Sequence, residues 1–530
     1  MVENNFKGTF NLLRFYLRRD KFVLPIWTLL PVILILGQVS FIQSMVDWQK
    51  FLAELSENPL TKAILGPIVP LSMEGAVLWR GMLQSAIVVM IGSSFTVIRH
   101  TRSDEESGRY ELIYGNGKGR YASTTAAFAL SFLASFISGL FIFIILAISG
   151  FSFLGSLLSG LTLCAVGLFF SSIGVLISQI FQGSGSARGI IAAIYFISMV
   201  PMIINNLGGG NTFWAWLVPE AWFKITMPYG DNNFWPLLIF VILSAIPVIL
   251  AYYLFNTRDL GSGIFKEKLG PEESTALNSP MALAFRQHKK TIIYWCIGMS
   301  FIGSSIGFIT PNISENISEM LVSMSSWADT MSKLGNREGF VSVTIYLLGL
   351  MAGTSVYGIA TILNLKTEES EHYSEVLLAY PISRVKLMSS YLTMAYAGSA
   401  IILLVLGVAV GLGWGYSSGD MTLIFRSMVM SLTKIPSIWV IIGIAAMLYG
   451  WIPRYSSLLS WVILGMFIVI EMFWEAGIVG WSAMKLTPFA YAHYSIPISE
   501  LSVLSLSLLV LLSIIFSFIS YRGFNRRDII

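Results

Sequence analysis

Two stretches dense in charge of both signs stand out between the apolar runs of this chain. They are RHTRSDEESGRYELIYGNGKGR (99–120), the first elbow, and LNLKTEESEHYSEVLLAYPISR (363–384), the second elbow. Aligned without gaps, Asp104-Glu105 coincides with Glu368-Glu369, and Arg120 coincides with Arg384. An offset of about half the chain, at the same place relative to the flanking apolar runs, indicates an internal duplication.

The side chains of the elbows are suited to ionic recognition. Glu105 and Arg109 are spaced i, i+4, so the first elbow can stabilise its own helix. In the second elbow several acids crowd one short helix, and clustered like charge costs helix stability unless a basic partner relieves it. These acids are Glu368, Glu369, Glu371 and Glu375, and the nearest cations in sequence are Lys366, Arg384 and Lys386. A solvated loop is the alternative, but two such loops at equivalent points favour docking of a partner.

The sequence contains no pattern typical of an enzyme. GNGKGR (115–120) lacks the spacing of a phosphate-binding loop. The four histidines are scattered without the spacing of metal ligands, and no GxSxG nucleophile motif occurs. We therefore predict no catalytic residue, no metal and no cofactor in this chain, which would take its energy from another protein.

Composition places the chain in a membrane. Of its 530 residues 55% are hydrophobic and 12% are charged, against about 25% charged in soluble proteins. Apolar runs of about twenty residues predict an all-α protein with about twelve transmembrane helices. Their expected bounds are 22–45, 76–98, 122–149, 153–181, 190–207, 236–256, 291–310, 341–363, 389–413, 436–452, 457–474 and 500–520. The mixed segment 421–435 is expected at the surface.

The Gly-, Pro- and charge-containing segment 257–280 is the clearest linker. It divides the chain into a first six-span half, 1–256, and a second, 281–530, each carrying one elbow. Before the first span, residues 5–20 predict an amphipathic helix at the membrane interface, with a cytosolic extension of the span as the alternative. Most of the 33 Lys and Arg residues lie in the termini, the elbows and the linker, which indicates that these are cytoplasmic. A net charge of +4, scattered along the chain, argues against nucleic acid as a partner.

Four stretches resemble the permeases of type-2 ABC exporters, most closely the double-length antibiotic-resistance permeases of the tetronasin (polyketide) exporter type. They are RHTRSDEESGRYEL (99–112), LVPEAWFKITMPYGDNNFWPLL (217–238), TRDLGSGIF…GPEES…LNSPMALAFR (257–286) and LTPFAYAHYSIP (486–497). In the second elbow His372-Tyr373 stands where the first has Gly108-Arg109, so the two elbows need not be equivalent.

The resemblance implies a fused pseudo-dimer in a bacterial plasma membrane, with a separate ABC ATPase, in two copies, bound to cytoplasmic coupling helices in the elbows. ATP and Mg would be held by that partner, and the substrate would be a small hydrophobic or amphipathic antibiotic, drug, peptide or lipid. The residues matching the coupling region are Asp104, Glu105, Glu106, Arg109, Glu111, Glu368, Glu369, Glu371 and Glu375.

Substrate contacts are less defined by the sequence. Trp214, Trp216 and Trp222 are expected near the outer surface, as interfacial anchors or as the lining of an exit gate. An ion-gradient secondary transporter or a lipid scramblase stays open as an alternative function, although no Asp or Glu lies near the middle of a predicted span. A sensor of antibiotics is a third class, and the short outer loops argue against it.

Overall fold

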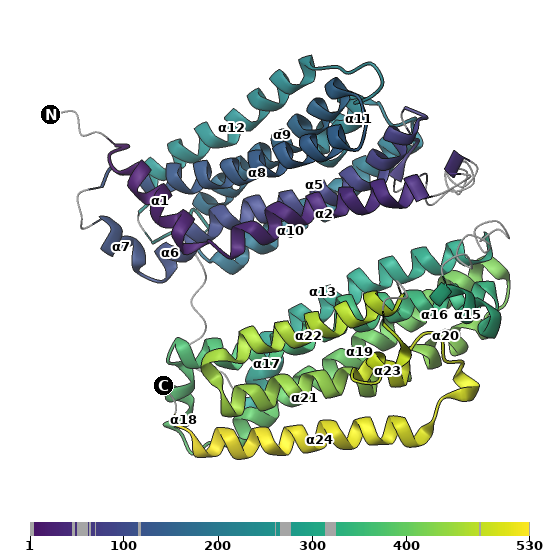
Figure 1. Ribbon diagram of the computed structural model, residues 1–530. Coiled ribbons are helices and arrows are strands. Elements are labelled where there is room, and N and C mark those ends of the chain that lie inside the picture. Colours follow the sequence, from purple (N-terminus) through teal and green to yellow (C-terminus); the bar gives the residue numbers. More distant parts are fainter. Residues whose placement is uncertain are drawn as a thin grey trace. The chain divides into compact units, whose positions relative to one another are not determined.

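The computed structural model describes residues 5–44, 48–49, 62, 65–68, 70–114, 118–259, 261–265, 277–312, 325–475 and 479–528. The chain divides into two compact units, Met1–Gly270 and Pro271–Ile530. Each unit is a bundle of long helices, with its elbow at one end of the bundle (Figure 1). The unit boundary falls inside the expected linker, of which residues 266–276 lie outside the described part of the chain.

In the described part of the first unit there are six long helices and several short ones. Its elements are α1 (Thr9–Arg19), α2 (Val23–Ser44), α5 (Met73–His100), α6 (Arg102–Glu106), α7 (Arg109–Tyr114), α8 (Ala122–Ile148), α9 (Phe153–Ile180), α10 (Ser184–Leu207), η1 (Phe213–Leu217), η2 (Pro219–Ala221), α11 (Trp222–Thr226) and α12 (Trp235–Thr257). Helices α5 and α9 pack against each other in the core; α2 and α8 contact α5, while α8 and α12 contact α9.

The second unit repeats this order of elements. They are α13 (Pro280–Ile309), η3 (Thr310–Asn312), α15 (Ser325–Leu334), α16 (Asn336–Ile345), the π-helix η4 (Tyr346–Thr354), α17 (Ser355–Ser370), α18 (Tyr373–Leu378), α19 (Arg384–Ser418), α20 (Thr422–Leu432), α21 (Ile435–Trp451), α22 (Pro453–Glu475), α23 (Trp481–Met484), η5 (Pro488–Ala492), η6 (Ile498–Glu500) and α24 (Val503–Arg526). The pair α17 and α21 takes the place of α5 and α9, and α24 packs on α21 as α12 packs on α9.

The all-α fold predicted from the apolar runs is confirmed. Within the described residues, twelve helices are long and apolar enough to cross a membrane, six in each unit. The described part of the chain has no β-strand, and its one isolated bridge joins Phe181 to Phe265. Helices satisfy their own backbone hydrogen bonds, which is the condition for a segment to cross lipid.

Three local expectations differ from the structure. The segment 421–435, expected at the surface, contains α20, whose Ser427, Met430 and Ser431 are buried against α19. The second span of the second unit is a continuous helical run through η4, a π-helix that no apolar period predicts. The segment 311–340 between two expected spans, whose polar composition predicts a loop, contains the helix α15. Local composition is a weak guide at these places because packing decides the outcome.

Helix α1 has the amphipathic character expected of it. Leu12 and Tyr16 are buried against α8, whereas Phe10 and Leu17 are exposed. Two of its apolar side chains therefore face away from the bundle, as an interfacial helix requires.

Small residues allow a close helix contact in the second unit, between α13 and α19. A Cβ added to Gly307 would lie 2.0 Å from the carbonyl oxygen of Val410, and one added to Gly413 would lie 2.2 Å from that of Ser304. Gly303 stands one turn before Gly307 on the same face. This is the small-residue spacing that lets helix backbones approach in a membrane.

We therefore expect Gly307→Val to force α13 and α19 apart and to cost about 1–3 kcal/mol of stability, the usual range for overpacking. Thermal unfolding of the purified chain in detergent measures the loss. Gly298→Val is the matched control, because a Cβ at Gly298 of the same helix meets nothing within 4 Å. Equal losses in the two variants would contradict this packing.

Candidate functional site

Both elbows turn the chain at the same aligned position. In the first elbow Gly108, with φ +69°, separates α6 from α7. In the second, His372 has φ +62° and lies between α17 and α18. A left-handed conformation is easy for glycine and strained for histidine. The two elbows thus share a backbone turn, although their sequences differ there.

Asp104 is fully buried beneath the first elbow. Its carboxylate accepts hydrogen bonds from the guanidinium of Arg19 in α1, at 2.9 and 2.7 Å. Arg109 approaches the same carboxylate at 3.7 Å. The hydrogen bond with Asp104 raises the pKa of Arg19, against the opposing effect of burial. Asp104 therefore ties the elbow to the N-terminal helix.

Glu105 is held between two arginines. Arg258, just after α12, donates to both of its oxygens, at 2.6 and 2.9 Å, and Arg102 donates at 2.7 Å. The three side chains are at most 3% exposed. Arg102 also donates to the backbone oxygens of Gln182 and Gly261. A buried bidentate pair of this kind fixes geometry as well as charge.

Glu369 occupies the equivalent position in the second elbow. Arg527, just after α24, donates to its two oxygens at 2.5 and 2.6 Å. The hydroxyl of Tyr449 in α21 donates at 2.8 Å. Glu369 is 5% exposed. The carboxylate is therefore satisfied within its own unit.

The remaining elbow acids have weaker contacts or lie at the surface. Glu368 accepts from the amide of Gln287 at 2.9 Å, and Glu106 accepts from the backbone N–H of Ser184 at 3.2 Å. Glu375 lies 3.1 Å from His372. Glu106, Arg109, Glu111, Glu371 and Glu375 are exposed.

The expected pairing of Glu105 with Arg109 was wrong, because the helix ends at Glu106 and the turn at Gly108 carries Arg109 toward Asp104 instead. In the second elbow Glu369 needs no external cation, because Arg527 neutralises it, whereas Glu371 and Glu375 stay exposed. Arg258 and Arg527 stand far from the elbows in the chain, and no spacing in the sequence pairs them with the glutamates.

The second elbow exposes apolar as well as acidic side chains. Tyr373, Val376 and Tyr380 are 60%, 61% and 64% exposed; the first two are spaced i, i+3 on α18, and Tyr380 follows the end of that helix. An open hollow beside them is lined by Glu375, Leu378, Ala379, Ile382, Ser383 and Arg384. An exposed apolar cluster edged by acids is typical of a protein-binding surface.

At the opposite end of the first unit, the three tryptophans have unequal surroundings. Trp222 is buried and stacks on Phe240, with ring centroids 3.8 Å apart. Trp216 is partly buried against Trp235 and Phe240, and Trp214 is 40% exposed. Trp222 is thus a core residue of this conformation, and of the three only Trp214 presents a large free surface.

Lys224 anchors the segment that contains these tryptophans. Its ammonium donates to the backbone oxygen of Leu65 at 2.6 Å and to the side-chain oxygen of Asn206 at 2.5 Å. Burial lowers the pKa of Lys224 to about 7 and raises the pKa of the nearby-in-sequence Glu220 to about 7. No motif or spacing in the sequence marks either residue.

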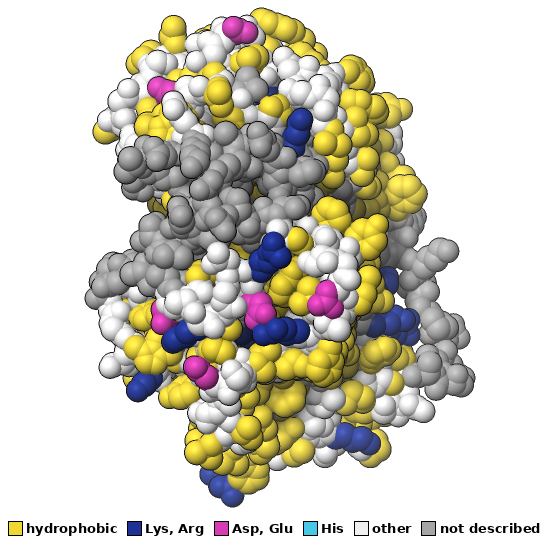
Figure 2. Space-filling model, turned by 90° about the vertical axis from the view of Figure 1, so that its right-hand side faces the viewer, with side chains coloured by type: hydrophobic (Ala, Val, Ile, Leu, Met, Phe, Trp, Pro, Cys, Tyr) yellow, Lys and Arg dark blue, Asp and Glu magenta, His cyan; other side chains and the backbone are white. Residues whose placement is uncertain are grey.

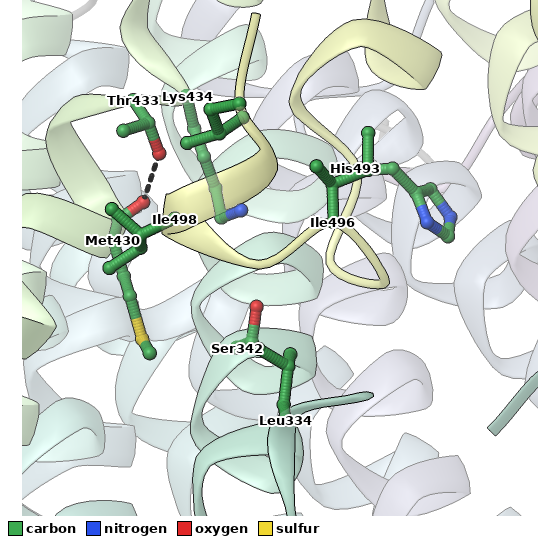
Figure 3. A pocket seen from close by; sticks show the side chains of 9 residues that line it. Leu334, Ser342, Met430, Thr433, Lys434, His493, Ile496 and Ile498 are labelled. Carbon is green, nitrogen blue, oxygen red and sulfur yellow. Dashed lines mark hydrogen bonds between the residues drawn. The ribbon is translucent and has the colours of Figure 1, made fainter. Parts of the chain in front are cut away.

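The second unit has a buried polar cluster at the same end. Glu471 accepts hydrogen bonds from Tyr346 at 2.6 Å and lies 2.8 Å from Nε2 of His493. Lys434 donates to the backbone oxygen of Ala492 at 3.1 Å. Figure 3 shows the Lys434 amine pointing into a small pocket lined also by Ser342 and His493. The cluster holds segment 479–500 against the bundle.

Among the described side chains in Figure 2, Lys and Arg lie beside Asp and Glu as well as among apolar and neutral ones. Arg426, for example, pairs with Glu338 at 2.7 Å. Within the described ranges, no three His, Cys, Asp or Glu side chains are grouped so as to hold a metal ion. The elbows are therefore the strongest candidate site.

The elbow geometry separates structural acids from surface acids. Glu105→Gln and Glu369→Gln each leave a buried arginine without its full charge partner, so we expect losses of about 3–5 kcal/mol. Glu111→Gln and Glu371→Gln, which alter exposed acids of the same elbows, should stay within about 0.5 kcal/mol. Thermal unfolding in detergent compares the four variants. Equal stability in all four would show that the buried pairs contribute nothing.

Comparison with known proteins extends these observations. A family model described as "Multidrug efflux system permease Rv1217c, C-terminal domain" matches residues 277–525. The chain is also 30% identical, over 504 residues, to the multidrug efflux system permease protein Rv1217c of Mycobacterium tuberculosis. That alignment covers 92% of this chain and 89% of the relative, and so includes both units. This chain therefore belongs to the family of multidrug efflux permeases.

Proposed function

We propose that this chain is the transmembrane subunit of an ATP-driven ABC exporter, and that a separate ATPase binds each elbow. The observation that carries the proposal is the pair of elbows itself. At aligned positions in the two units, a short helix stands outside the bundle while a buried glutamate beneath it is clamped by an arginine. A surface helix whose base is held by a buried ion pair is suited to receiving force from a partner protein.

The exposed side chains supply the docking chemistry. The second elbow offers Tyr373, Val376 and Tyr380 beside Glu371 and Glu375. Aromatic anchors with a polar rim are the usual composition of an energetic contact between proteins. The first elbow offers a more polar surface, with Glu106, Arg109 and Glu111 exposed. The predicted coupling residues thus divide into exposed ones, which would touch the ATPase, and buried ones, which would support them.

The substrate would be a hydrophobic or amphipathic compound, such as a drug, an antibiotic, a peptide or a lipid. The relative in Mycobacterium tuberculosis is named as a multidrug efflux permease, which supports this class. The finer assignment to tetronasin-type exporters rests on the sequence resemblance alone. ATP and Mg would be bound by the partner ATPase and not by this chain.

A second candidate function is transport coupled to an ion gradient. It is favoured by Glu471, a fully buried acid in α22 that contacts His493 and Tyr346. A buried ionisable residue in a membrane segment is a reasonable candidate for proton coupling. Efflux that persists without the ATPase and stops with a protonophore would favour this function over the first.

The docking proposal predicts the behaviour of a charge-reversed second elbow. Glu371→Lys with Glu375→Lys should reduce the affinity of the permease for its co-expressed ATPase by at least about tenfold, or 1.4 kcal/mol, because both acids are exposed beside α18. Titration of the purified ATPase onto immobilised permease measures this change. Asp420→Lys with Glu500→Lys, exposed acids at the opposite end of the unit, is the matched control. Unchanged affinity in the elbow variant would refute docking at this site.

The proposed orientation places both termini and both elbows in the cytoplasm. In a chain with Cys164 and Cys296 replaced by alanine, a cysteine at Glu500 should react with a membrane-impermeant thiol reagent in intact cells. A cysteine at Glu371 should react only after the membrane is opened. Both positions are exposed, so accessibility within the protein does not distinguish them. The reverse labelling pattern would invert the orientation.

A further inference from the structure

A short sequence recurs at the end of the last long helix of each unit. FNTRD (255–259) spans the end of α12, and FNRRD (524–528) spans the end of α24. The repeated arginines are Arg258 and Arg527, the same two that clamp Glu105 and Glu369. The repeated phenylalanines lie beneath them, with each guanidinium 5.1 Å from the ring centroid. We call each glutamate with its arginine a clasp.

Each clasp is completed by a residue of α9 in the first unit or of α21 in the second. In the first unit, Nε of Arg258 donates to the side-chain oxygen of Gln179 in α9 at 2.8 Å. In the second unit, Tyr449 of α21 donates to Glu369, and the guanidinium of Arg527 lies 4.9 Å from its ring centroid. The chemistry differs, but both contacts come from the last turns of equivalent helices.

A second arginine braces each clasp from the start of the third span. Arg120 donates to the backbone oxygen of Phe255 at 3.2 Å, and Arg384 donates to that of Phe524 at 3.3 Å. These two arginines coincide in the gapless alignment of the elbows. The clasp, its phenylalanine and the second, bracing arginine therefore occur at matching places in the two units.

We propose that the two clasps transmit the movement of each elbow to the last helix of its unit, α12 or α24, so that elbow and helix move as one body. The proposal rests on the proposed function, because it assigns a path to force delivered by an ATPase at the elbows. Glu105, Arg258, Glu369 and Arg527 are then positioning residues that touch neither ATPase nor substrate.

The clasp restricts the relative movement of elbow and helix more than it adds stability. A buried ion pair is often no more stabilising than apolar side chains of the same volume. Its two parallel hydrogen bonds nevertheless restrict both the distance and the orientation of the groups that it joins. If the elbow moves, the last helix must move with it; otherwise the ion pair separates and leaves an unpaired charge in a buried site. Apolar side chains at the same place could move past each other without leaving a charge unpaired.

The first test replaces the bidentate arginine by a point charge. Arg527→Lys and Arg258→Lys keep the charge but lose the forked geometry. In proteoliposomes with the ATPase bound, we expect drug transported per ATP hydrolysed to fall by roughly fivefold or more, a typical ratio for the loss of coupling between sites. Arg526→Lys, an exposed neighbour of Arg527, is the matched control and should retain the ratio. A full ratio in both clasp variants would overturn the proposal.

The second test restores the connection by a different bond. In the chain without Cys164 and Cys296, Glu369→Cys with Arg527→Cys removes the clasp, and a short bifunctional thiol reagent then joins the two positions. Elbow and helix moving as one body predicts low coupling before cross-linking and recovered coupling afterwards. A purely stabilising pair predicts recovered thermal stability without recovered coupling, and that result would refute transmission.

The measurements distinguish the two proposals. If the unmodified permease does not bind the ATPase, or if its efflux does not consume ATP, the proposed function itself fails. If the ATPase binds and hydrolyses ATP normally while the clasp variants transport at the full ratio, only the clasp proposal fails.

Discussion

A carboxylate buried at the end of a helical bundle must have its charge compensated, and this requirement organises both elbows. Isolated in an apolar environment, such a group would cost several kcal/mol or would take up a proton. Here Glu105 and Glu369 each receive an arginine from the end of the last helix of their own unit. The ion pair therefore joins two chain segments that are separated in the sequence by four further spans. It adds a charged contact with the last helix to the other contacts that hold each elbow.

The sequence was sufficient for the parts of the fold that depend on local composition. Apolar runs of sufficient length revealed all twelve candidate spans, because hydropathy is a property of each segment by itself. It failed where packing decides, as in α20, whose Arg426 made the segment look like surface although Ser427 and Met430 are buried. The spacing of apolar residues does not predict the π-helix η4 either, because most of its residues are hydrophobic and fit any helical period.

The candidate site was predictable in place but not in its contacts. Dense charge between apolar runs located both elbows, and the alignment of Glu105 with Glu369 proved to join residues with equivalent partners. Which acids are buried could not be read from spacing, because the compensating cations lie at Arg19, Arg258 and Arg527. Pairing rules along one helix apply only while that helix continues, and α6 ends before Arg109.

The ends opposite the elbows follow the same repeat with different chemistry. LVPEAWFKITMP (217–228) and LTPFAYAHYSIP (486–497) align without gaps, so that Lys224 coincides with His493. Both are buried, and each contacts the fifth long helix of its unit: Lys224 contacts the amide of Asn206 in α10, and His493 contacts the carboxylate of Glu471 in α22. One unit thus has a cation against a neutral group where the other has an imidazole against an acid.

A similar inequality occurs beside the clasps. Asp104 is bound ionically by Arg19 of α1, whereas the aligned Glu368 meets the neutral amide of Gln287 in α13. The first elbow is therefore braced by two charged contacts, to α1 and to Arg258, and the second by one, to Arg527. Because an ion pair holds a buried acid more firmly than a single neutral hydrogen bond does, equal forces on the two elbows would displace the second more readily. The two elbows thus share one design but differ in their supporting contacts, and under the proposed function the transport cycle need not be symmetric.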